Sequence, residues 1–543
     1  MHTRSRVDSG HLLGLLILLA ARFVAAGEPT LESPPPFDPA GIRGSLLLCG
    51  GGRIPDPIRE EFVRLAGGEN GRLVIIPAGS GDDTVEADAA AVTDIWKSRG
   101  IGTVDTLHTR SRELADSYEF SAPLRDATAV WITGGRQTQI AATYSGTQVE
   151  TELRALIDRG GVIGGTSAGA ACQSRVMLVR GAIYDIPGFD LIPGAVVDQH
   201  FLVRNRKDRL LSALERHPAL VGLGIDEATA LVVHGRSLKC IGDSTVTICY
   251  GATGGCPCDE QVLQPGQSTD LTMLRRAVRE RIQPRAENTT PVRSEVPSGS
   301  LVIVGGGALP KEVVERFIAL AGGPDAPIVI LPTANPDPLP SEESERRFLE
   351  RAGAKNVRVL SARRREEVES PGFLQAVQQA RGIWFGGGRQ WRFVDAYEGT
   401  QAVEAFRSVL ARGGVIGGSS AGATIQGELL VRGSPLGNQQ MLCPGYERGF
   451  AFLPGTAIDQ HFTQRKRFAD MTGVMKTHPE ILGIGVDEAT AIVVQGATAE
   501  VLGNGQAHFY DGKSPATEDK PDHLSIAAGG KYNLADRKAI AGE

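Results

Sequence analysis

A long stretch of this sequence occurs twice, and the duplication limits what the chain can fold into. Residues 160–165 (GGVIGG) recur unchanged as 413–418, and residues 226–230 (DEATA) recur as 487–491. Three further segments match in the same order: 45–52 (SLLLCGGG) with 300–307 (SLVIVGGG), 131–137 (WITGGRQ) with 384–390 (WFGGGRQ), and 198–201 with 459–462 (both DQHF). A chain of 543 residues has room for two copies of one large domain.

The duplication sets the expected domain boundaries. We expect one domain at 45–283 and a second at 300–543, joined by a polar, proline-bearing linker at 284–299. Residues 1–26 contain arginines, an apolar stretch too short to span a membrane and a small-residue cleavage site, which is the pattern of a signal peptide. Residues 27–44, with three consecutive prolines, are expected to form a tether. The pattern predicts a secreted or periplasmic protein without a stable membrane span.

Within each copy, short apolar runs alternate with longer amphipathic stretches. The expected buried strands of the first copy are 46–48, 73–76, 129–132 and 162–163. Residues 149–160 and 207–217 show the apolar spacing of helices. Such alternation predicts an α/β fold with a mainly parallel sheet and helices on both faces. Active sites of these folds gather beyond the carboxyl ends of the strands, where this sequence has its glycine clusters.

Composition narrows the possible partners. The net charge is −6 and the isoelectric point is near 6.0, so nucleic acid is not an expected partner. No metal-ligand spacing repeats between the copies, and we expect neither a metal nor an organic cofactor. Cys49 and Cys172 lie in apolar surroundings and are expected to be buried thiols. Secretion would permit disulfides among Cys240, Cys249, Cys256 and Cys258.

A G-x-S-x-G segment follows an apolar strand in each copy, GTSAG at 165–169 and GSSAG at 418–422. In this context the motif forms a nucleophile elbow, a strained turn that exposes a serine. A single Gly/Ser/Ala turn is more often an ordinary loop, but its recurrence between a strand and a small-residue segment favours a nucleophile. The register of the two copies selects Ser167 and Ser420 over Ser419.

A serine nucleophile needs a general base, and two pairs of histidines occupy matching positions in the copies. His217 and His478 each precede a proline at the end of a helical stretch, where a histidine caps the last carbonyls. His200 and His461 instead belong to the polar DQHF segments. We therefore expect His200 and His461 to be the bases.

The base must be oriented by an acidic group. Asp226 and Glu227 end an apolar run, as do Asp487 and Glu488, and spacing alone does not choose between the two carboxylates. The order serine, histidine, acid differs from that of α/β-hydrolases. That fold family is set aside, because the histidine that would restore its order, His234, has no counterpart in the second copy.

Taken together, GTSAGA, DQHF with its trailing arginines, and GIDEATA resemble the cyanophycinases of the peptidase S51 family, which also contains dipeptidase E. The resemblance covers nearly all of both copies. It implies two tandem class I glutamine-amidotransferase-like (flavodoxin-like) α/β/α sandwiches. It further implies hydrolysis of β-aspartyl (cyanophycin-like) peptide bonds. Cyanophycinases release β-aspartyl-arginine from cyanophycin, a polyaspartate with arginine on each side-chain carboxyl. The implied triads are Ser167, His200 and Glu227, and Ser420, His461 and Glu488.

The same resemblance assigns substrate binding to Gln137, Asp198, Gln199, Arg204, Arg206 and Arg209, and in the second copy to Gln390, Asp459, Gln460, Arg465 and Arg467. Arginines can bind substrate carboxylates, and Asp198 can pair a cationic side chain. Arg136 and Arg389 depart from the family, which more often has aspartate there. Asp470 stands where the first copy has Arg209, so we expect the second copy to bind an acidic substrate more weakly.

Backbone amides are the expected oxyanion donors. They are those of Ala168 and of Gly134 or Gly135, with Ala421, Gly387 and Gly388 as their counterparts. Two other functions stay open: an α-aspartyl dipeptidase or other amide hydrolase on the same fold, and a non-catalytic secreted binding protein. Intact Ser, His and Glu in both copies oppose the last. An oligomer is possible.

Overall fold

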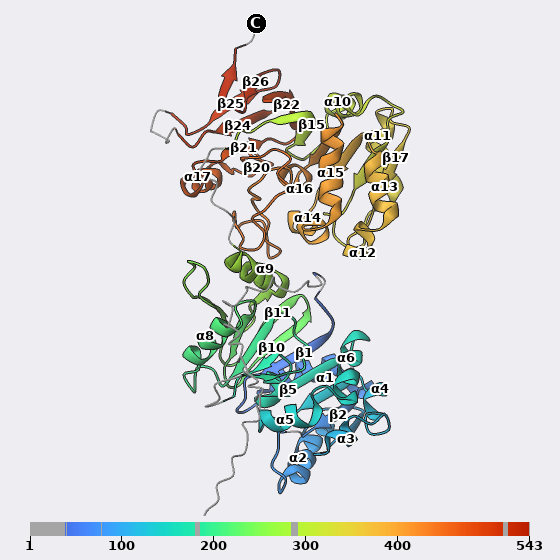
Figure 1. Cartoon of the computed structure of the whole chain (residues 1–543), viewed down its shortest axis with the longest axis vertical. Helices are drawn as coiled ribbons and strands as arrows, with labels where there is room; N and C mark the ends of the chain where they lie inside the picture. The colour runs from blue at the N-terminus through green and yellow to red at the C-terminus, as the bar shows by residue number, and fades with distance from the viewer. Residues whose placement is uncertain are drawn as a thin grey trace, which may run out of the picture. The chain divides into compact units, whose positions relative to one another are not determined.

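The computed structural model (Figure 1) describes residues 39, 41–77, 79–179, 185–283, 292–513 and 520–541. The expected signal peptide lies outside the described residues, as do most of the expected tether and residues 284–291 of the expected linker. Among the described residues, no helix has the length and apolar character needed to cross a membrane.

The first half is built on a mixed sheet. Its parallel part has the order β1 (Ile42–Cys49), β5 (Val162–Thr166), β4 (Ala129–Ile132), β2 (Arg72–Ile76) and β3 (Thr103–Thr106). On the other side of β1, the antiparallel strands β10 (Thr229–Gly235), β11 (Ser237–Gly242) and β14 (Ser268–Asp270) extend the sheet. The apolar runs at 46–48, 73–76 and 129–132 therefore form strands of one sheet, as expected.

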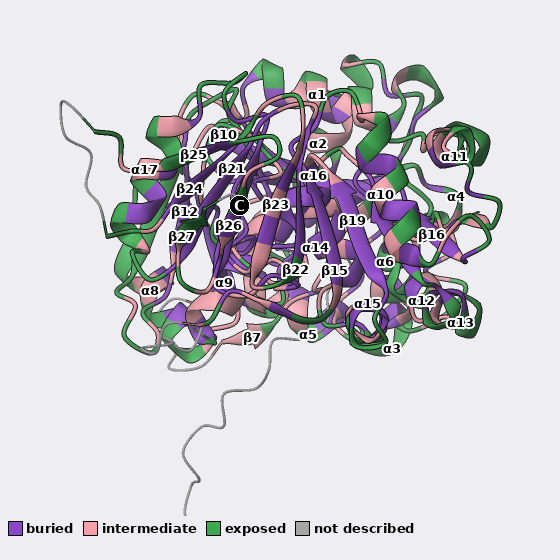
Figure 2. Cartoon of the chain, turned by 90° about the horizontal axis from the view of Figure 1, so that it is seen from above, coloured by how far each residue is buried: buried purple, intermediate pink, exposed green. Residues whose placement is uncertain are grey.

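Both faces of this sheet are covered. Leu46 and Leu48 of β1 belong to one apolar core and Leu47 and Cys49 to another, because successive side chains of a strand point to opposite faces. The first core includes helices α5 (Gln137–Tyr144), α6 (Gln148–Asp158) and α9 (Leu271–Ile282), and the second includes α1 (Asp56–Ala66) and α2 (Val85–Ser98). Figure 2 shows the buried strands between helices whose outer faces are exposed.

A smaller sheet carries the next part of the site. It has the order β13 (Asp259–Leu263), β12 (Val246–Tyr250), β9 (Val221–Ile225) and β8 (Ala195–Gln199), with β8 parallel to β9. Helix α8 (Lys207–Arg216) packs on it through Leu210 and Leu214. The short elements are η1 (Gly68–Asn70), α3 (Arg112–Ala115), α4 (Pro123–Asp126), α7 (Ala168–Ala171), β6 (Val176–Met177) and β7 (Ile186–Pro187).

The second half repeats this plan. Its parallel strands are β15 (Val296–Val304), β19 (Val415–Ser419), β18 (Gly382–Phe385), β16 (Ile328–Leu331) and β17 (Val357–Val359), and its antiparallel strands are β22 (Thr490–Gly496), β23 (Thr498–Gly503), β26 (Lys531–Asn533) and β27 (Lys538–Ile540). The smaller sheet has β20 (Thr456–Gln460), β21 (Leu482–Val486), β24 (Gln506–Tyr510) and β25 (Leu524–Ala527). The predicted fold class, two tandem α/β domains with mainly parallel sheets, is confirmed.

The helices of the second half take up corresponding positions. They are α10 (Lys311–Ala321), α11 (Glu342–Arg351), α12 (Arg365–Val368), α13 (Pro371–Gln379), α14 (Gln390–Tyr397), α15 (Gln401–Ala411), α16 (Ala421–Thr424) and α17 (Phe468–Thr477). One difference matters below: the first half has α9 after its last antiparallel strand, whereas β26 and β27 occupy the sheet edge of the second half.

Three local details differ from or extend the expectations. β15 begins at Val296, inside the segment expected to be linker, because Val296 is buried and pairs with Gly496. β1 likewise begins at Ile42, inside the expected tether, and pairs with Gly235. All seven cysteines are described and all are free thiols, so the chain has no disulfide in this structure. As expected, Cys49 and Cys172 are buried, and burial raises the pKa of both thiols.

Candidate active site

The two candidate nucleophiles lie in sharp turns between a strand and a helix. Ser167 joins β5 to α7 with φ 53° and ψ −114°, and Ser420 joins β19 to α16 with φ 56° and ψ −112°. Positive φ in a residue other than glycine is strained, and it is the backbone geometry of a nucleophile elbow. The turn also needs Gly165, since a Cβ there would lie 2.2 Å from the carbonyl oxygen of Gly169.

The serine, histidine and glutamate expected from the sequence are brought together in both halves. In the first half Ser167 Oγ lies 2.8 Å from His200 Nε2, and His200 Nδ1 lies 2.5 Å from Glu227 Oε1. In the second half the Ser420–His461 and His461–Glu488 distances between the same atoms are 3.0 and 2.6 Å. Each histidine follows the end of β8 or β20 and each glutamate follows β9 or β21, so adjacent parallel strands place the histidine and the glutamate side by side.

The structure distinguishes the two carboxylates that the sequence left open. Asp226 turns away from the imidazole and accepts hydrogen bonds from the backbone amides of Leu202 and Val203, both at 3.1 Å, and from the hydroxyl of Ser244 at 2.9 Å. It thereby fixes the loop that follows His200, while Glu227 contacts the ring. Neighbouring residues at the end of a strand point in opposite directions, which separates the two roles.

A glycine triplet leaves room for the side chains of the histidine and the glutamate. A Cβ on Gly51 would lie 2.2 Å from His200 Cε1, and one on Gly52 would lie 2.8 Å from Glu227 Oε2. The carbonyl oxygen of Gly50 accepts the backbone amide of His200 at 2.7 Å. The sequence predicts only that glycine clusters lie beyond the carboxyl ends of the strands; it did not reveal this role, although the triplet recurs at 305–307 directly after the corresponding strand.

The histidines are set up to accept a proton. Burial lowers the pKa of His200 below its ordinary value of 6.5, and the positive charge of Arg204 lowers it further, against the opposing hydrogen bond to Glu227. The same causes, with Arg465 in place of Arg204, lower the pKa of His461. Both imidazoles are therefore neutral at neutral pH, which is the state a general base requires.

A glycine turn lies beside each serine. Gly134 packs so closely on Ser167 that a Cβ on the glycine would lie 3.3 Å from the serine Cβ. Among the described residues, the backbone amides of Gly134 and Gly135 donate no hydrogen bond. Gly135 has φ +131°, and a Cβ there would overlap the carbonyl oxygen of Gly79. Ala168 opens α7 directly after the serine. The counterparts in the second half are Gly387, Gly388 and Ala421.

The structure changes the interpretation of the arginines after the base. Asp198 is fully buried and accepts hydrogen bonds from Arg206 Nη1 at 3.4 Å and from Arg209 Nε at 2.9 Å. These two guanidinium groups therefore neutralise a carboxylate of the protein itself. Arg206 also donates to the carbonyl oxygen of Gln199 at 2.6 Å.

In the second half a different pair of arginines neutralises the equivalent buried carboxylate. Asp459 is also fully buried and accepts hydrogen bonds from Arg467 at 2.6 Å and from Arg432 at 3.1 Å. Arg432 also donates to Asp470 at 2.6 Å. Asp470 therefore balances an arginine from another loop, and the structure gives no support to our expectation that it repels substrate where Arg209 attracts it.

Arg204 and Arg465 remain available to a ligand. Both are exposed one turn after the base, and within the described residues neither makes an ion pair. The Oε1 atoms of Gln199 and Gln460 are buried and accept no hydrogen bond from described residues. Gln137 is half-buried and Gln390 is buried, each at the first position of the helix that follows the glycine turn. No cluster of described residues has the composition of a metal site.

Comparisons with known proteins found relatives of both halves of the chain. The sequence profile of peptidase family S51 matches residues 46–241 and 301–502. A cyanophycinase from Geminocystis herdmanii is 34% identical over 224 residues, which are 39% of this chain and 82% of that protein. A cyanophycinase from a Nostoc species is 33% identical over 225 residues, 39% of this chain and 74% of that protein. A crystal structure of a peptidase from an acI-B1 actinobacterium is 26% identical with a TM-score of 0.35, covering 42% of this chain and 98% of that one.

Proposed function

Since the chain belongs to peptidase family S51 and is a serine-type peptidase, we propose that each half hydrolyses β-aspartyl peptide bonds through its own Ser–His–Glu site. The observation that carries the proposal is the continuous hydrogen-bond relay from serine to glutamate, present in both halves with the same atoms. A serine next to a neutral imidazole that is itself held by a carboxylate is the arrangement of an activated nucleophile.

In the first step the serine attacks the substrate carbonyl. Ser167 Oγ forms a bond to the carbonyl carbon while its proton passes to His200 Nε2, and the electron pair of the C=O bond moves onto oxygen. The amides of Gly134 or Gly135 and of Ala168 stabilise that oxyanion. Glu227 stabilises the imidazolium through Nδ1–H without taking its proton.

The intermediate then collapses and the amine leaves. The C=O bond re-forms, the C–N bond breaks, and His200 Nε2–H protonates the departing nitrogen, which leaves an acyl-serine ester. Water enters, His200 takes a proton from it, and the hydroxide attacks the ester in the same geometry. The bond between the carbonyl carbon and Ser167 Oγ then breaks, His200 Nε2–H returns the proton to Oγ, and the carboxylic acid product leaves. The second half follows the same course with Ser420, His461 and Glu488.

Substrate recognition rests on the exposed arginine after each base. A β-aspartyl dipeptide has a free α-carboxylate, and in cyanophycin each side-chain-linked arginine keeps its own. A guanidinium can bind such a carboxylate with two hydrogen bonds. Arg204 and Arg465 meet this requirement because they are exposed and follow the base directly. Every aspartate of cyanophycin carries an arginine through a β-aspartyl link, and the curated relatives are cyanophycinases.

The proposal extends to location. The arginine-bearing, apolar leader at 1–26 supports export to the periplasm or the medium. Fractionation of the expressing cells and N-terminal sequencing of the mature chain test this. Retention of the leader on a cytoplasmic protein would contradict it.

The substrate is tested with a panel of peptides. The protein is incubated with cyanophycin, a β-aspartyl-arginine dipeptide and the matching α-aspartyl dipeptide, and released amino acids and dipeptides are measured. We expect cleavage of cyanophycin or the β-linked dipeptide and little turnover of the α-linked one. Preference for the α-linked peptide would make the protein an α-aspartyl dipeptidase, and binding without turnover would make it a binding protein.

A further inference from the structure

Two acidic residues lie at the C-terminal end of helix α14 in the second half, and its counterpart in the first half lacks them. Asp395 lies in the last turn of α14, and Glu398 follows it. By register with α5 of the first half, the equivalent positions are Ala142 and Ser145. Both acidic residues contact α9, a helix of the first half.

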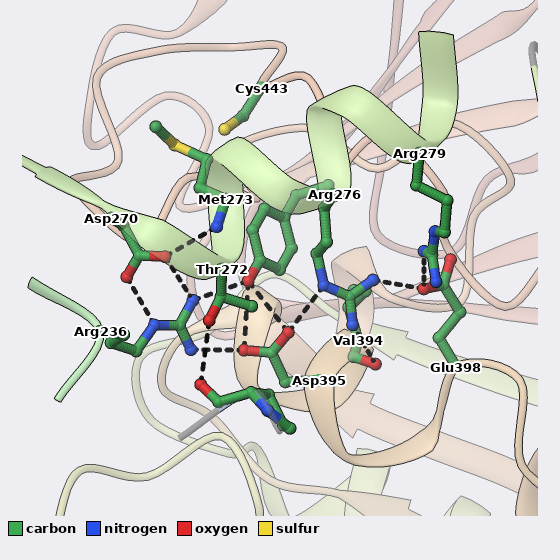
Figure 3. Close-up of polar contacts among 12 residues, drawn as sticks. Arg236, Asp270, Thr272, Met273, Arg276, Arg279, Val394, Asp395, Glu398 and Cys443 are labelled. Carbon is green, nitrogen blue, oxygen red and sulfur yellow. Dashed lines mark hydrogen bonds and ion pairs between the residues drawn. The ribbon is translucent and has the colours of Figure 1, made fainter. Parts of the chain in front are cut away.

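Helix α9 and the neighbouring strand end bind these carboxylates (Figure 3). Arg276 of α9 donates to Asp395 Oδ1 at 2.9 Å and also to Glu398. Arg279, one turn further along α9, donates to Glu398 at 2.5 Å. Arg236, at the turn between β10 and β11, donates to Asp395 Oδ2 at 2.6 Å. These contacts lie within one compact unit, Phe37–Glu543.

The network of ion pairs between α9 and the end of α14 is buried, and it therefore fixes how these elements pack. The side chain of Arg276 is 4% exposed and that of Asp395 is 7% exposed. Asp270, the N-cap of α9, holds Arg236 from the other side through two hydrogen bonds. Removing one partner of a buried ion pair leaves an uncompensated charge, so the two elements are held in one relative position.

A segment unique to the second half joins the same contact. Residues 433–448 lie between Arg432 and Gly449, where the first half has only 181–187. Tyr446 donates its hydroxyl to Asp395 at 2.9 Å, and the amide of Gly445 donates to Glu280 of α9 at 2.6 Å. Gly445 touches α9 directly, because a Cβ there would lie 2.5 Å from Arg276 Cβ.

The opposite ends of α14 and of segment 433–448 lie at the second active site. α14 starts at Gln390, immediately after the Gly387–Gly388 turn beside Ser420. Arg389, in that same turn, donates to the carbonyl oxygens of Ser434 and Gly437, each at 2.6 Å. An eight-residue helix is about 12 Å long and moves as a rigid rod, so fixing its last turn fixes its first.

We propose that α9 of the first half is a positioning element of the second active site. Through Asp395, Glu398 and segment 433–448, it holds the Gly387–Gly388 turn at the distance from Ser420 that oxyanion stabilisation requires. The Ser420 site then depends on the docked first half, whereas the Ser167 site has no such support on α5 among the described residues. This inference rests on the proposed role of both serines as nucleophiles.

The test measures both serines in one molecule. The full-length protein is treated with a fluorophosphonate probe, and labelling of the Ser167 and Ser420 peptides is followed over time by mass spectrometry. In Asp395→Asn we expect the labelling rate at Ser420 to fall about tenfold to a hundredfold, since misplacement by about 1 Å has effects of this size. Labelling should still reach full stoichiometry, and the rate at Ser167 should not change.

Controls separate positioning from stability. Asp395→Glu keeps the charge and should restore most of the rate, and Ala142→Asn, at the equivalent position of α5, should affect neither serine. An unchanged Ser420 rate, or partial labelling at the normal rate, would overturn the inference, because the latter reports only a lost folded fraction. If Asp395→Asn does not fold, Glu398→Gln, at a more exposed position, decides by the same criteria. Absence of labelling at both serines of the wild type would instead contradict the proposed function.

Discussion

Gly51 and His200 are in direct contact: a Cβ on Gly51 would lie 2.2 Å from Cε1 of the imidazole. Gly306 and His461 repeat the contact in the second half, at 2.3 Å. Both glycines also have positive φ, 110° and 104°. The imidazole of each candidate site can therefore occupy its place only if the residue after the first glycine of the triplet has no side chain.

Gly51→Ala should disable the first site by displacing its base. In a Ser420→Ala background, where only Ser167 can act, we expect kcat to fall about a hundredfold or more, because the imidazole loses its distance to Ser167. Gly306→Ala in a Ser167→Ala background should do the same. Steady-state kinetics on the preferred β-aspartyl substrate measure both effects.

Gly160→Ala is the matched control for Gly51→Ala. Gly160 has φ +93°, and a Cβ there would have no described atom within 4 Å, so the substitution strains the backbone without touching the site. It should lower stability and leave kcat unchanged. Equal losses of activity in the two variants would show that backbone strain, and not displacement of His200, is responsible.

Arg204 should contribute to substrate binding. In the Ser420→Ala background, Arg204→Ala should raise KM for an acidic substrate about tenfold to a hundredfold, because a hydrogen bond to a charged group is worth about 1.5–3 kcal/mol. Lys207→Ala removes a nearby exposed cation that pairs with Glu260 at 2.7 Å, and it should have little effect. Arg465→Ala tests the second site in the same way. A KM as high in Lys207→Ala as in Arg204→Ala would reduce the role of Arg204 to general electrostatics.

The lowered pKa values of His200 and His461 set the acid limb of the pH profile. Each base acts in its neutral form, so kcat/KM should fall only as the pH drops below 6.5, the ordinary value of histidine. The same shift makes the folded state bind the proton less tightly than the unfolded state. Its contribution to stability is therefore complete above pH 6.5 and decreases as the pH falls through the window below it.

Arg204→Ala provides an internal check on this assignment. Because the positive charge of Arg204 lowers the pKa of His200, its removal should move the acid limb of the first site to higher pH. The profiles of the two single-serine variants measure this. A limb centred above pH 6.5 in the parent, or one that moves to lower pH in Arg204→Ala, would contradict the account.

The fold and the chemical groups of the site were largely predictable from sequence. Apolar runs alternating with amphipathic stretches report local burial, and this predicted the α/β architecture in both halves. The position of Ser167 between β5 and α7 followed from the glycine-rich motif, which is local as well. Glu227 was separated from Asp226 only by the resemblance to the S51 family, because strand periodicity assigns them opposite faces without saying which face holds the histidine.

Contacts between distant segments were not predictable. Arg209 and Asp470 occupy the same register position, and their opposite charges suggested opposite effects on substrate. The structure shows that each forms an ion pair with a buried partner: Arg209 with Asp198, and Asp470 with Arg432. Such pairings depend on where other loops lie in space. The contact between α9 and Asp395 was missed for the same reason.

The central claim is that each half holds its own serine nucleophile, and turnover by serine variants tests it most directly. The rate of β-aspartyl hydrolysis is compared among wild type, Ser167→Ala, Ser420→Ala and the double variant. Because either site can act alone, we expect each single variant to retain part of the activity. The double variant should lose about a thousandfold or more while keeping the melting temperature of the wild type, as loss of a covalent nucleophile does. Hydrolysis by the double variant at the wild-type rate would contradict the account.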